Sequence, residues 1–312
     1  MKPFLACSIL LAVACAESNG PSDVALTIDA GVTFDGDGGP PLPEDTGPPA
    51  GCDQDEDGFL AEHCGGDDCD DSARGINPNS NELCSFEDEN CSGTNNERLD
   101  CTFYAHGPNE LYRVDPFAEL VHPAGLIDTP SRFGVQDIDI DANGSIIGVT
   151  RRELLRLESD GTYEVLAAIE TPANTNGLAI NSSDQIFLTQ KMPAGETSQA
   201  YTVTLDGSVS VLGNLEPFQS SGDCVVLKDD SLLMTAPSDD GDILVYVDSR
   251  DASTRPIGAI GSNKVYGLSA SFGYLFGVTD EGRVLLIDAN TGAGEELFRR
   301  EDLRFWGAAN GD

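Results

Sequence analysis

Basic residues are scarce in this 312-residue chain. Only 17 Lys and Arg stand against 54 Asp and Glu, which gives a formal net charge of −37 at pH 7. This balance argues against a nucleic-acid partner, because binding a phosphate backbone requires Lys and Arg. Arg74 and Arg98 are the only basic residues between positions 16 and 101, so the acidic excess is greatest there. Such a surface favours cations as partners.

Residues that support nucleophilic catalysis are also few. The chain has three histidines, and only His106 and His122 lie outside the cysteine-rich region. A Ser/His/Asp triad therefore has little material, and no glycine-rich phosphate motif precedes a predicted helix. Cys224 stands in an apolar strand with nothing basic beside it, which predicts a buried free thiol. We predict no catalytic residue from the sequence.

Long apolar runs are absent after residue 15, so no later segment is expected to cross a membrane. Residues 1–15 combine a basic start, an apolar stretch and small residues, as an export signal does. The end of this stretch, Leu11 to Cys15, resembles the lipobox of bacterial lipoproteins, although Ala12 stands where Leu is usual. The resemblance implies acylation of Cys15 and anchoring to a lipid bilayer, at the bacterial outer membrane or cell surface. The alternative is an ordinary signal peptide cut after Ala14 or Ala16, which gives a periplasmic or secreted protein.

Residues 16–51 are rich in Ala, Gly, Pro, Ser and Asp. A segment with so little apolar surface does not offset its ordering entropy, so we expect a disordered linker. Its role is then to hold the folded part of the chain away from a membrane.

Six cysteines gather in residues 52–101. An even number in an exported module predicts three disulfides, and the sequence does not choose among the 15 connectivities. Zinc is disfavoured, because no Cys-x2-Cys pair occurs and only His63 is nearby. The six predicted disulfide cysteines are Cys52, Cys64, Cys69, Cys84, Cys91 and Cys101.

The module opens with alternating carboxylates at Asp53, Asp55 and Asp57, followed by Gly58. This is how a calcium loop begins: alternate side chains converge on a hard cation, glycine permits the turn, and the carbonyl of Phe59 supplies another oxygen. The twelfth position of such a loop, which usually holds a bidentate Glu, is Cys64. Asp67 or Asp68 would have to bend back to replace that ligand.

The order of acids, glycines and cysteines over about 50 residues resembles the metal-binding motif of MopE-type secreted bacterial proteins. Its opening is also similar to the calcium repeats of thrombospondin type 3. Where that motif usually has Asp-Gly after two of its cysteines, this chain has Ser85-Phe86 and Ser92-Gly93, so no second site on Asp88 and Asn90 is expected. The resemblance implies divalent-metal binding by Asp53, Asp55, Asp57, Asp67, Asp68, Asp70 and Asp71.

The ligand types favour calcium over other ions. Copper prefers imidazole and sulfur ligands, whereas the module has no methionine, a single histidine, and cysteines that we expect to be oxidised. An oxygen-rich loop suits calcium. Another divalent cation, or an acidic disulfide module without metal, are the alternatives.

From Thr102 the pattern changes to short strands separated by Gly, Asp and Asn. Four similar segments begin at Asp137, Gly177, Asp223 and Gly267, at intervals of 40, 46 and 44 residues, and each is followed by further strands. Four-stranded units of about 40 residues indicate a β-propeller. The repeats resemble the NHL and SMP-30-like propellers through this periodicity alone.

The two ends of this region complement each other. Gly307–Asp312 reads as a first strand with nothing after it, whereas Thr102–His106 and Leu111–Val114 read as second and third strands without a first. Joined, they make a fifth blade and leave no open sheet edge. We therefore predict an all-β chain with a five-bladed β-propeller in residues 102–312, six or seven blades if a degenerate repeat is hidden, preceded by the disulfide-rich module.

First strands of propeller blades line the central channel. Polar and aromatic side chains near their starts suit a sugar or a peptide, so a carbohydrate or protein ligand is expected at the channel mouth. We therefore interpret the chain as a lipid-anchored binding protein. One rival is a metal-dependent hydrolase or lactonase using Asp137, Asn176 and Asp223, and another is metal capture by the acidic module. The predicted ligand-binding residues are Gln136, Asp137, Asn176, Asp223, Tyr266 and Trp306.

Overall fold

The computed structural model describes residues 51–129, 134–170, 174–193 and 196–310. The predicted export signal, Cys15 and the predicted linker up to residue 50 lie outside the described residues. Within the described part of the chain, no helix is long and apolar enough to cross a membrane.

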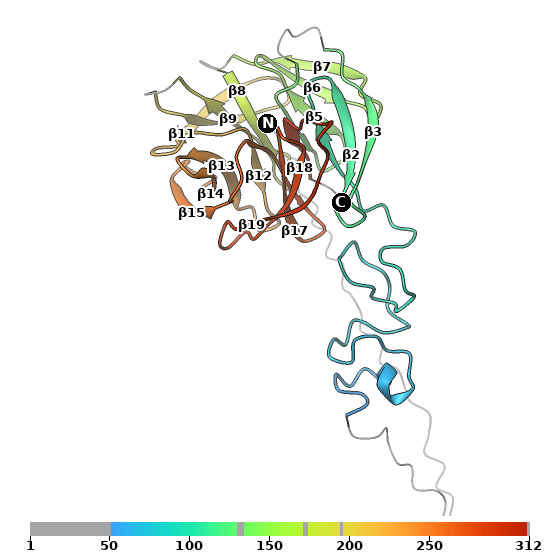
Figure 1. The fold of residues 1–312 in the computed structure, drawn as a ribbon. Helices are drawn as coiled ribbons and strands as arrows, with labels where there is room; N and C mark the ends of the chain where they lie inside the picture. The colour runs from blue at the N-terminus through green and yellow to red at the C-terminus, as the bar shows by residue number, and fades with distance from the viewer. Residues whose placement is uncertain (1–50, 130–133, 171–173, 194–195, 311–312) are drawn as a thin grey trace, which may run out of the picture. The chain divides into compact units, whose positions relative to one another are not determined.

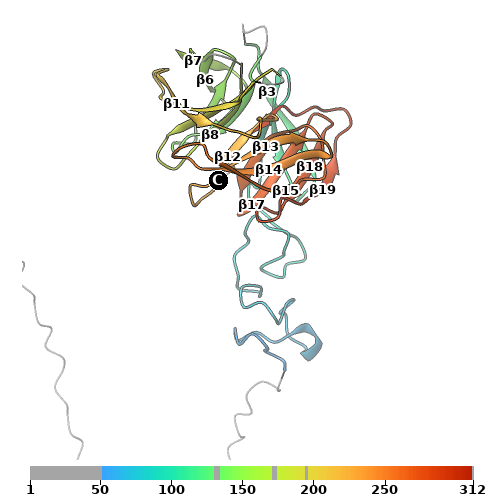
Figure 2. The same ribbon diagram turned by 90° about the vertical axis from the view of Figure 1, so that its left-hand side faces the viewer.

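The described residues from Phe103 onward form five four-stranded sheets, so the predicted five-bladed propeller is confirmed. Figure 1 and Figure 2 show these sheets from two directions. All neighbouring strands within a sheet are antiparallel. From inner to outer edge, the first sheet consists of β20 (Gly307–Ala308), β1 (Phe103–His106), β2 (Glu110–Asp115) and β3 (Leu120–Leu126), and the second of β4 (Asp137–Ile140), β5 (Ile146–Val149), β6 (Glu153–Leu157) and β7 (Tyr163–Ala168). The third sheet consists of β8 (Asn174–Ile180), β9 (Ile186–Lys191), β10 (Gln199–Val203) and β11 (Val209–Asn214), and the fourth of β12 (Cys224–Val226), β13 (Leu232–Ser238), β14 (Gly241–Val247) and β15 (Thr254–Ala259). The fifth sheet consists of β16 (Val265–Ser271), β17 (Tyr274–Thr279), β18 (Arg283–Ile287) and β19 (Gly294–Arg299).

The ring is closed by the sheet that both ends of the propeller share. Strand β20 pairs with β1, with Ala308 opposite Ala105 and Gly307 opposite His106, as the two half-blades in the sequence predict. The inner strands contact one another in the order β4, β8, β12, β16 and β20, and β20 returns to β4. Each inner strand pairs with a sheet neighbour on one edge only, and its other edge lies inside the closed ring.

The outer strands of the sheets are more exposed to solvent than the strands nearer the channel. The second strands β5, β9, β13 and β17 are almost wholly buried, since sheets pack against both of their faces. The outer strands β7, β11, β15 and β19 repeat one pattern of half-buried and exposed residues. In all five sheets a β-bulge shifts the register between the third and fourth strands. Such a bulge bends the outer strand. Apolar clusters between neighbouring sheets form the core.

The module at residues 52–101 has little regular structure. It contains a single described helix, the 3-10 turn η1 (Glu62–Cys64). Its stability must come from cross-links, because few of its apolar side chains are buried. Three disulfides are present, and the connectivity that the sequence left open is Cys52–Cys64, Cys69–Cys91 and Cys84–Cys101.

Candidate functional site

Two regions carry the residues that the sequence singled out. One is a cavity at the start of the inner strands, which we call the mouth. The other is the acidic loop at the beginning of the disulfide module, which we call the acidic loop and define as residues 53–71.

The mouth is a cavity of about 200 Å³ built from equivalent positions of all five sheets. One residue near the start of each inner strand faces it: Gln136, Asn176, Gly222, Tyr266 and Trp306. Lys191 at the end of β9 and the buried Ser221 complete the lining. The five-fold repeat of the fold therefore places four different side chains and one glycine around one cavity.

Two aromatic side chains form one side of the mouth. The indole N–H of Trp306 donates to Asp280 Oδ1 at 3.3 Å, and the Trp306 backbone N–H donates to the His106 carbonyl at 2.8 Å. Tyr266 packs against Gly222, where an added Cβ would lie 2.7 Å from Tyr266 Cα and 2.8 Å from its Cδ1. Glycine at this position therefore makes room for Tyr266.

The amide of Asn176 is held on one side and open on the other. Its Nδ2 donates to the Ser220 carbonyl at 3.4 Å, whereas its Oδ1 is shielded from solvent and has no hydrogen-bond partner. An unpartnered, shielded carbonyl oxygen is costly unless a donor reaches it. A ligand hydroxyl or N–H would satisfy this oxygen.

Asp137 and Asp223 do not line the mouth, although the sequence placed them with its residues. Both side chains are fully buried beneath it. The oxygens of Asp137 accept N–H groups of Ile138 and, at 2.6 Å, Leu178 on the neighbouring inner strand. Asp223 accepts from Cys224 and from Leu268 in the same way. These carboxylates join inner strands of neighbouring sheets, which have no sheet hydrogen bonds to each other.

The two carboxyl groups are also hydrogen-bonded to each other. Burial raises the pKa of Asp223 to about 8, and burial together with the charge of Asp223 raises the pKa of Asp137 well above its ordinary value. Two acids in this position share a proton. Their role is structural, because every oxygen already has a protein donor.

His106 lies beside this pair and is fully buried. Its Nδ1 is 2.9 Å from the Gly107 carbonyl, and burial lowers the pKa of its imidazole to about 4, so the ring is neutral. His122 stands in the outer strand β3, and Cys224 is a buried free thiol, as the sequence predicts. None of these three residues reaches the mouth.

The acidic loop brings Asp53, Asp55 and Asp57 together, each offering an oxygen within 4.8 Å of the others. The turn is fixed by backbone N–H groups: Asp57 donates to Asp53 and Asp55 at 3.1 Å, and Phe59 donates to Asp57 at 2.8 Å. Asp55 Oδ2 is shielded from solvent without a hydrogen-bond partner.

Asp68 lies near enough to this group to feel the charges of Asp57 and Asp55, although it is not one of the three converging carboxylates. Its backbone N–H donates to the Leu60 carbonyl at 3.1 Å, which folds residue 68 back beside Ala61. The side chain is 1% exposed, and its Oδ2 has no hydrogen-bond partner. Burial and the nearby charges of Asp57, Asp55 and Asp71 raise the pKa of Asp68. A buried carboxylate oxygen among like charges, without a donor, fits a hard cation.

The other predicted ligands are placed differently. Asp67 is exposed, Asp70 accepts from the backbone N–H and hydroxyl of Ser72, and Asp71 accepts from Gln54 N–H at 2.9 Å. Both oxygens of Asp88 accept backbone N–H groups, at 3.0 Å from Ser92 and 2.7 Å from Gly93. Among the predicted ligands, the shielded oxygens without a hydrogen-bond partner therefore belong to Asp55 and Asp68, and Glu97 Oε2 is a further one in the module.

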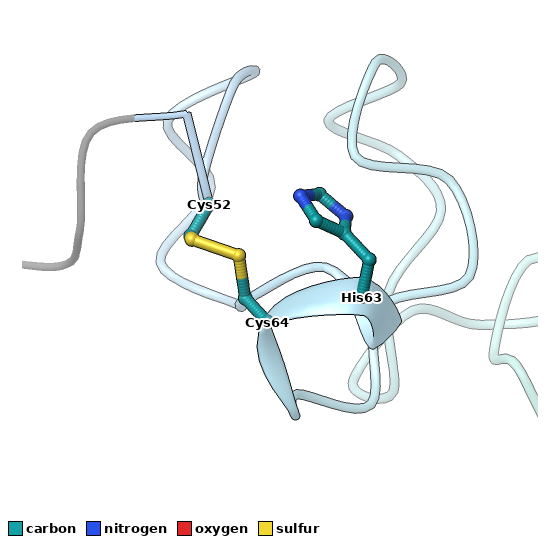
Figure 3. Close-up of side chains that lie close together, drawn as sticks. All are labelled: Cys52, His63 and Cys64. Carbon is teal, nitrogen blue, oxygen red and sulfur yellow. A yellow bond between two sulfur atoms is a disulfide. The ribbon is translucent and has the colours of Figure 1, made fainter.

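Cys52, His63 and Cys64 also lie close together, as Figure 3 shows. The two sulfur atoms are joined in a disulfide. A sulfur in a disulfide is not a thiolate and does not ligate zinc. This cluster is therefore a cross-link with a neighbouring histidine.

The sequence analysis did not predict that Lys191 lines the mouth. The residue ends a second strand, whereas the sequence argument considered only first-strand starts. A lysine directly after the apolar strand 186–190 was the available signal, because β9 runs antiparallel to β8 and ends where β8 begins.

No known family and no curated protein match this sequence. Among solved structures, a chain of the nidogen/laminin complex is 12% identical, with 68% of this chain and 82% of that chain covered and a TM-score of 0.47. A gluconolactonase from Xanthomonas campestris is 15% identical, with 64% and 77% covered and a TM-score of 0.42. A streptogramin B lyase is 15% identical, with 64% and 70% covered and a TM-score of 0.39. Because these identities and TM-scores are low, we assign the propeller fold from the strand pairing described above and not from these similarities.

Proposed function

We propose that this chain is an exported, lipid-anchored bacterial protein that binds a ligand at the mouth of its propeller. The observation that carries the proposal is the mouth itself, where one residue from each of the five sheets faces a single cavity. Aromatic surfaces with a few convergent polar groups are typical of binding sites. Acylation at Cys15 and export are supported by the sequence of residues 1–15.

The rival function as a metal-dependent hydrolase has less support. It needs Asp137 and Asp223 as ligands in an accessible site, yet both are fully buried and accept backbone N–H groups with each oxygen. Of its three predicted residues, only Asn176 faces the mouth. The donor set therefore does not fit a catalytic metal at this place, and we derive no reaction from it.

Binding at the mouth is directly observable, because Trp306 is the only tryptophan of the chain. We expect a panel of saccharides and short peptides to contain ligands that change its fluorescence. Tyr266→Ala should weaken their binding at least tenfold, since a partly buried aromatic residue in a cavity carries much of the binding energy. The matched control Tyr163→Ala, on outer strand β7, should bind as the parent does. Ligands that bind equally well to the Tyr266 variant would place the site elsewhere.

A calcium ion in the acidic loop is the second part of the proposal. Asp53, Asp55, Asp57 and Asp68 would hold it, and the ion would neutralise carboxylates that otherwise repel one another. The proposed role is structural, because the three disulfides and the ion together compensate for a thin core. Metal capture as the function of the module has no separate observation in its favour.

Asp68→Asn tests this site, because its effect on stability should have opposite signs in chelator and in calcium. In chelator, the variant should be more stable than the parent, because it removes a buried charge whose pKa is raised by its neighbours. In calcium the variant should be less stable than the parent, because it has lost a ligand and binds the metal more weakly. Saturating metal at 100 times the dissociation constant stabilises the folded parent by about 2.7 kcal/mol, and the variant should gain less than this. Thermal unfolding and calorimetric titration measure both effects.

Asp67→Asn is the matched control, since its side chain is exposed and it neighbours Asp68. It should follow the parent in both conditions. If calcium does not raise the unfolding temperature of the parent chain, the structural calcium site is wrong.

A further inference from the structure

The charges around the mouth differ from those of the chain as a whole. Lys191 is exposed and lines the cavity. Lys264 and Arg304 lie 3.7 and 3.8 Å from Asp280, the carboxylate that also accepts the indole N–H of Trp306. Lys264 and Arg304 are thus paired with an acid and do not line the cavity, whereas the described residues of the lining include Lys191 and no carboxylate, in a chain with a net charge of −37. A cation in the lining favours an anionic ligand.

Lys191 itself has no ion-pair partner among the described residues. Burial raises the pKa of Asp242, a carboxylate that is 4% exposed, and the charge of Lys191 opposes that rise. Both Asp242 oxygens are already taken, by the Ser221 hydroxyl at 3.1 Å and by the Val265 N–H at 2.7 Å. The three N–H donors of Lys191 are therefore available to a ligand in the mouth.

The rest of the lining selects for a ring with hydroxyl groups. Trp306 and Tyr266 offer apolar faces, and the Asn176 Oδ1 requires a donor from the ligand. A cavity of about 200 Å³ is smaller than the range of about 300–1,000 Å³ that holds drug-sized ligands. It suits a single sugar ring, either free or at the end of a longer chain.

We infer that the mouth takes a carboxylate-bearing sugar, with its carboxylate on Lys191, a hydroxyl on Asn176 Oδ1 and a ring face against Trp306 and Tyr266. This inference rests on the proposed binding function and specifies its ligand class. A charged hydrogen bond from Lys191 then distinguishes an acidic sugar from a neutral one of the same shape.

The test uses the full mature chain and two sugars of matched shape, methyl glucuronide and methyl glucoside. Titration followed by Trp306 fluorescence should show glucuronide binding about tenfold more tightly, the ratio that one charge-assisted hydrogen bond provides. Lys191→Gln should reduce glucuronide affinity to that of the glucoside. Lys228→Gln makes the same charge change at the opposite end of inner strand β12, and it should leave the ratio unchanged. An oligouronate that binds with the same Lys191 dependence identifies a polysaccharide end as the source of the sugar.

Two results would overturn the inference, and they differ in what they mean for the proposed function. Equal binding of both sugars, lost in Tyr266→Ala, shows that the mouth binds sugar without reading its charge, so the proposed function stands. No binding of either sugar rejects the sugar class. Whether the mouth binds anything is then decided by the saccharide and peptide panel.

Discussion

Asp223→Ala is expected to lower the free energy of unfolding by about 3–5 kcal/mol, among the largest effects of any single side chain here. The change leaves the N–H groups of Cys224 and Leu268 without an acceptor and removes the hydrogen-bond partner of Asp137. Each unsatisfied buried group costs about 1–3 kcal/mol. Urea unfolding of the parent and variant at one pH measures the difference.

The exposed Asp240 provides the control for charge removal alone, and Asp240→Ala should change stability by no more than about 0.5 kcal/mol. A loss below about 1 kcal/mol in Asp223→Ala would contradict the structural role of the buried pair. It would also reopen the hydrolase hypothesis, since these carboxylates would then be available for another purpose.

Asp223→Asn tests whether Asp137 and Asp223 share a proton, through the pH dependence of the unfolding free energy. The pKa of Asp223 is raised to about 8 in the folded protein, whereas it is about 3.9 in an unfolded chain. Stability from the bound proton is therefore fully present below about pH 4 and is lost as pH rises toward 8, at up to about 1.4 kcal/mol per pH unit. The variant has no such proton, so the difference in unfolding free energy between parent and variant should shrink or reverse with rising pH. A difference that is constant from pH 5 to 8 would contradict proton sharing.

The periodicity of the sequence was sufficient to predict the propeller, including its closure by β20. The similar segments that begin at Asp137, Gly177, Asp223 and Gly267 recur at nearly constant intervals, and a sequence displays such intervals directly. The convergence of Asp53, Asp55 and Asp57 was predictable for the same reason, from alternating acids before a glycine. The disulfide connectivity was not, because it depends on how an irregular chain folds back on itself.

The depth of side chains within the channel was not visible in the sequence either. Residues 136 and 137 are neighbours, yet Gln136 faces the mouth and Asp137 is buried beneath it. Successive residues of a strand point in opposite directions, and the direction toward the mouth depends on how the sheets pack around the axis. The sequence therefore predicted which positions meet at the channel, but it did not separate residues that line the mouth from residues that hold the ring together.

This packing has a second regularity, which the sequence displays but does not explain. Around the ring, equivalent positions near the starts of the inner strands alternate between glycine and aspartate: Gly307, Asp137, Gly177, Asp223 and Gly267. Each aspartate needs room to reach the neighbouring inner strand, and a residue without a side chain leaves that room. The ring has five members, so two glycines are adjacent in ring order, at Gly267 and Gly307.

Gly307→Ala is therefore expected to destabilise the propeller by at least about 3 kcal/mol, or to prevent its folding. A Cβ at this position would lie 2.3 Å from Asp137 Oδ1 and 2.5 Å from His106 Nε2. Both neighbours are fully buried, and Asp137 is held by Ile138 and Leu178, so neither can move without breaking contacts. Thermal unfolding of the purified variant, or its yield of folded protein, measures the effect.

Two further variants show whether the clash with Asp137 is the cause. Gly75→Ala is the control for the substitution itself, because an added Cβ there meets nothing within 4 Å, and stability should hardly change. Combining Gly307→Ala with Asp137→Gly removes the carboxylate that the methyl group meets, so the double variant should be less destabilised than the sum of its single changes. Simple additivity would mean that Gly307 is required by His106 or the backbone alone, and that the alternation of glycine and aspartate does not hold the ring closed.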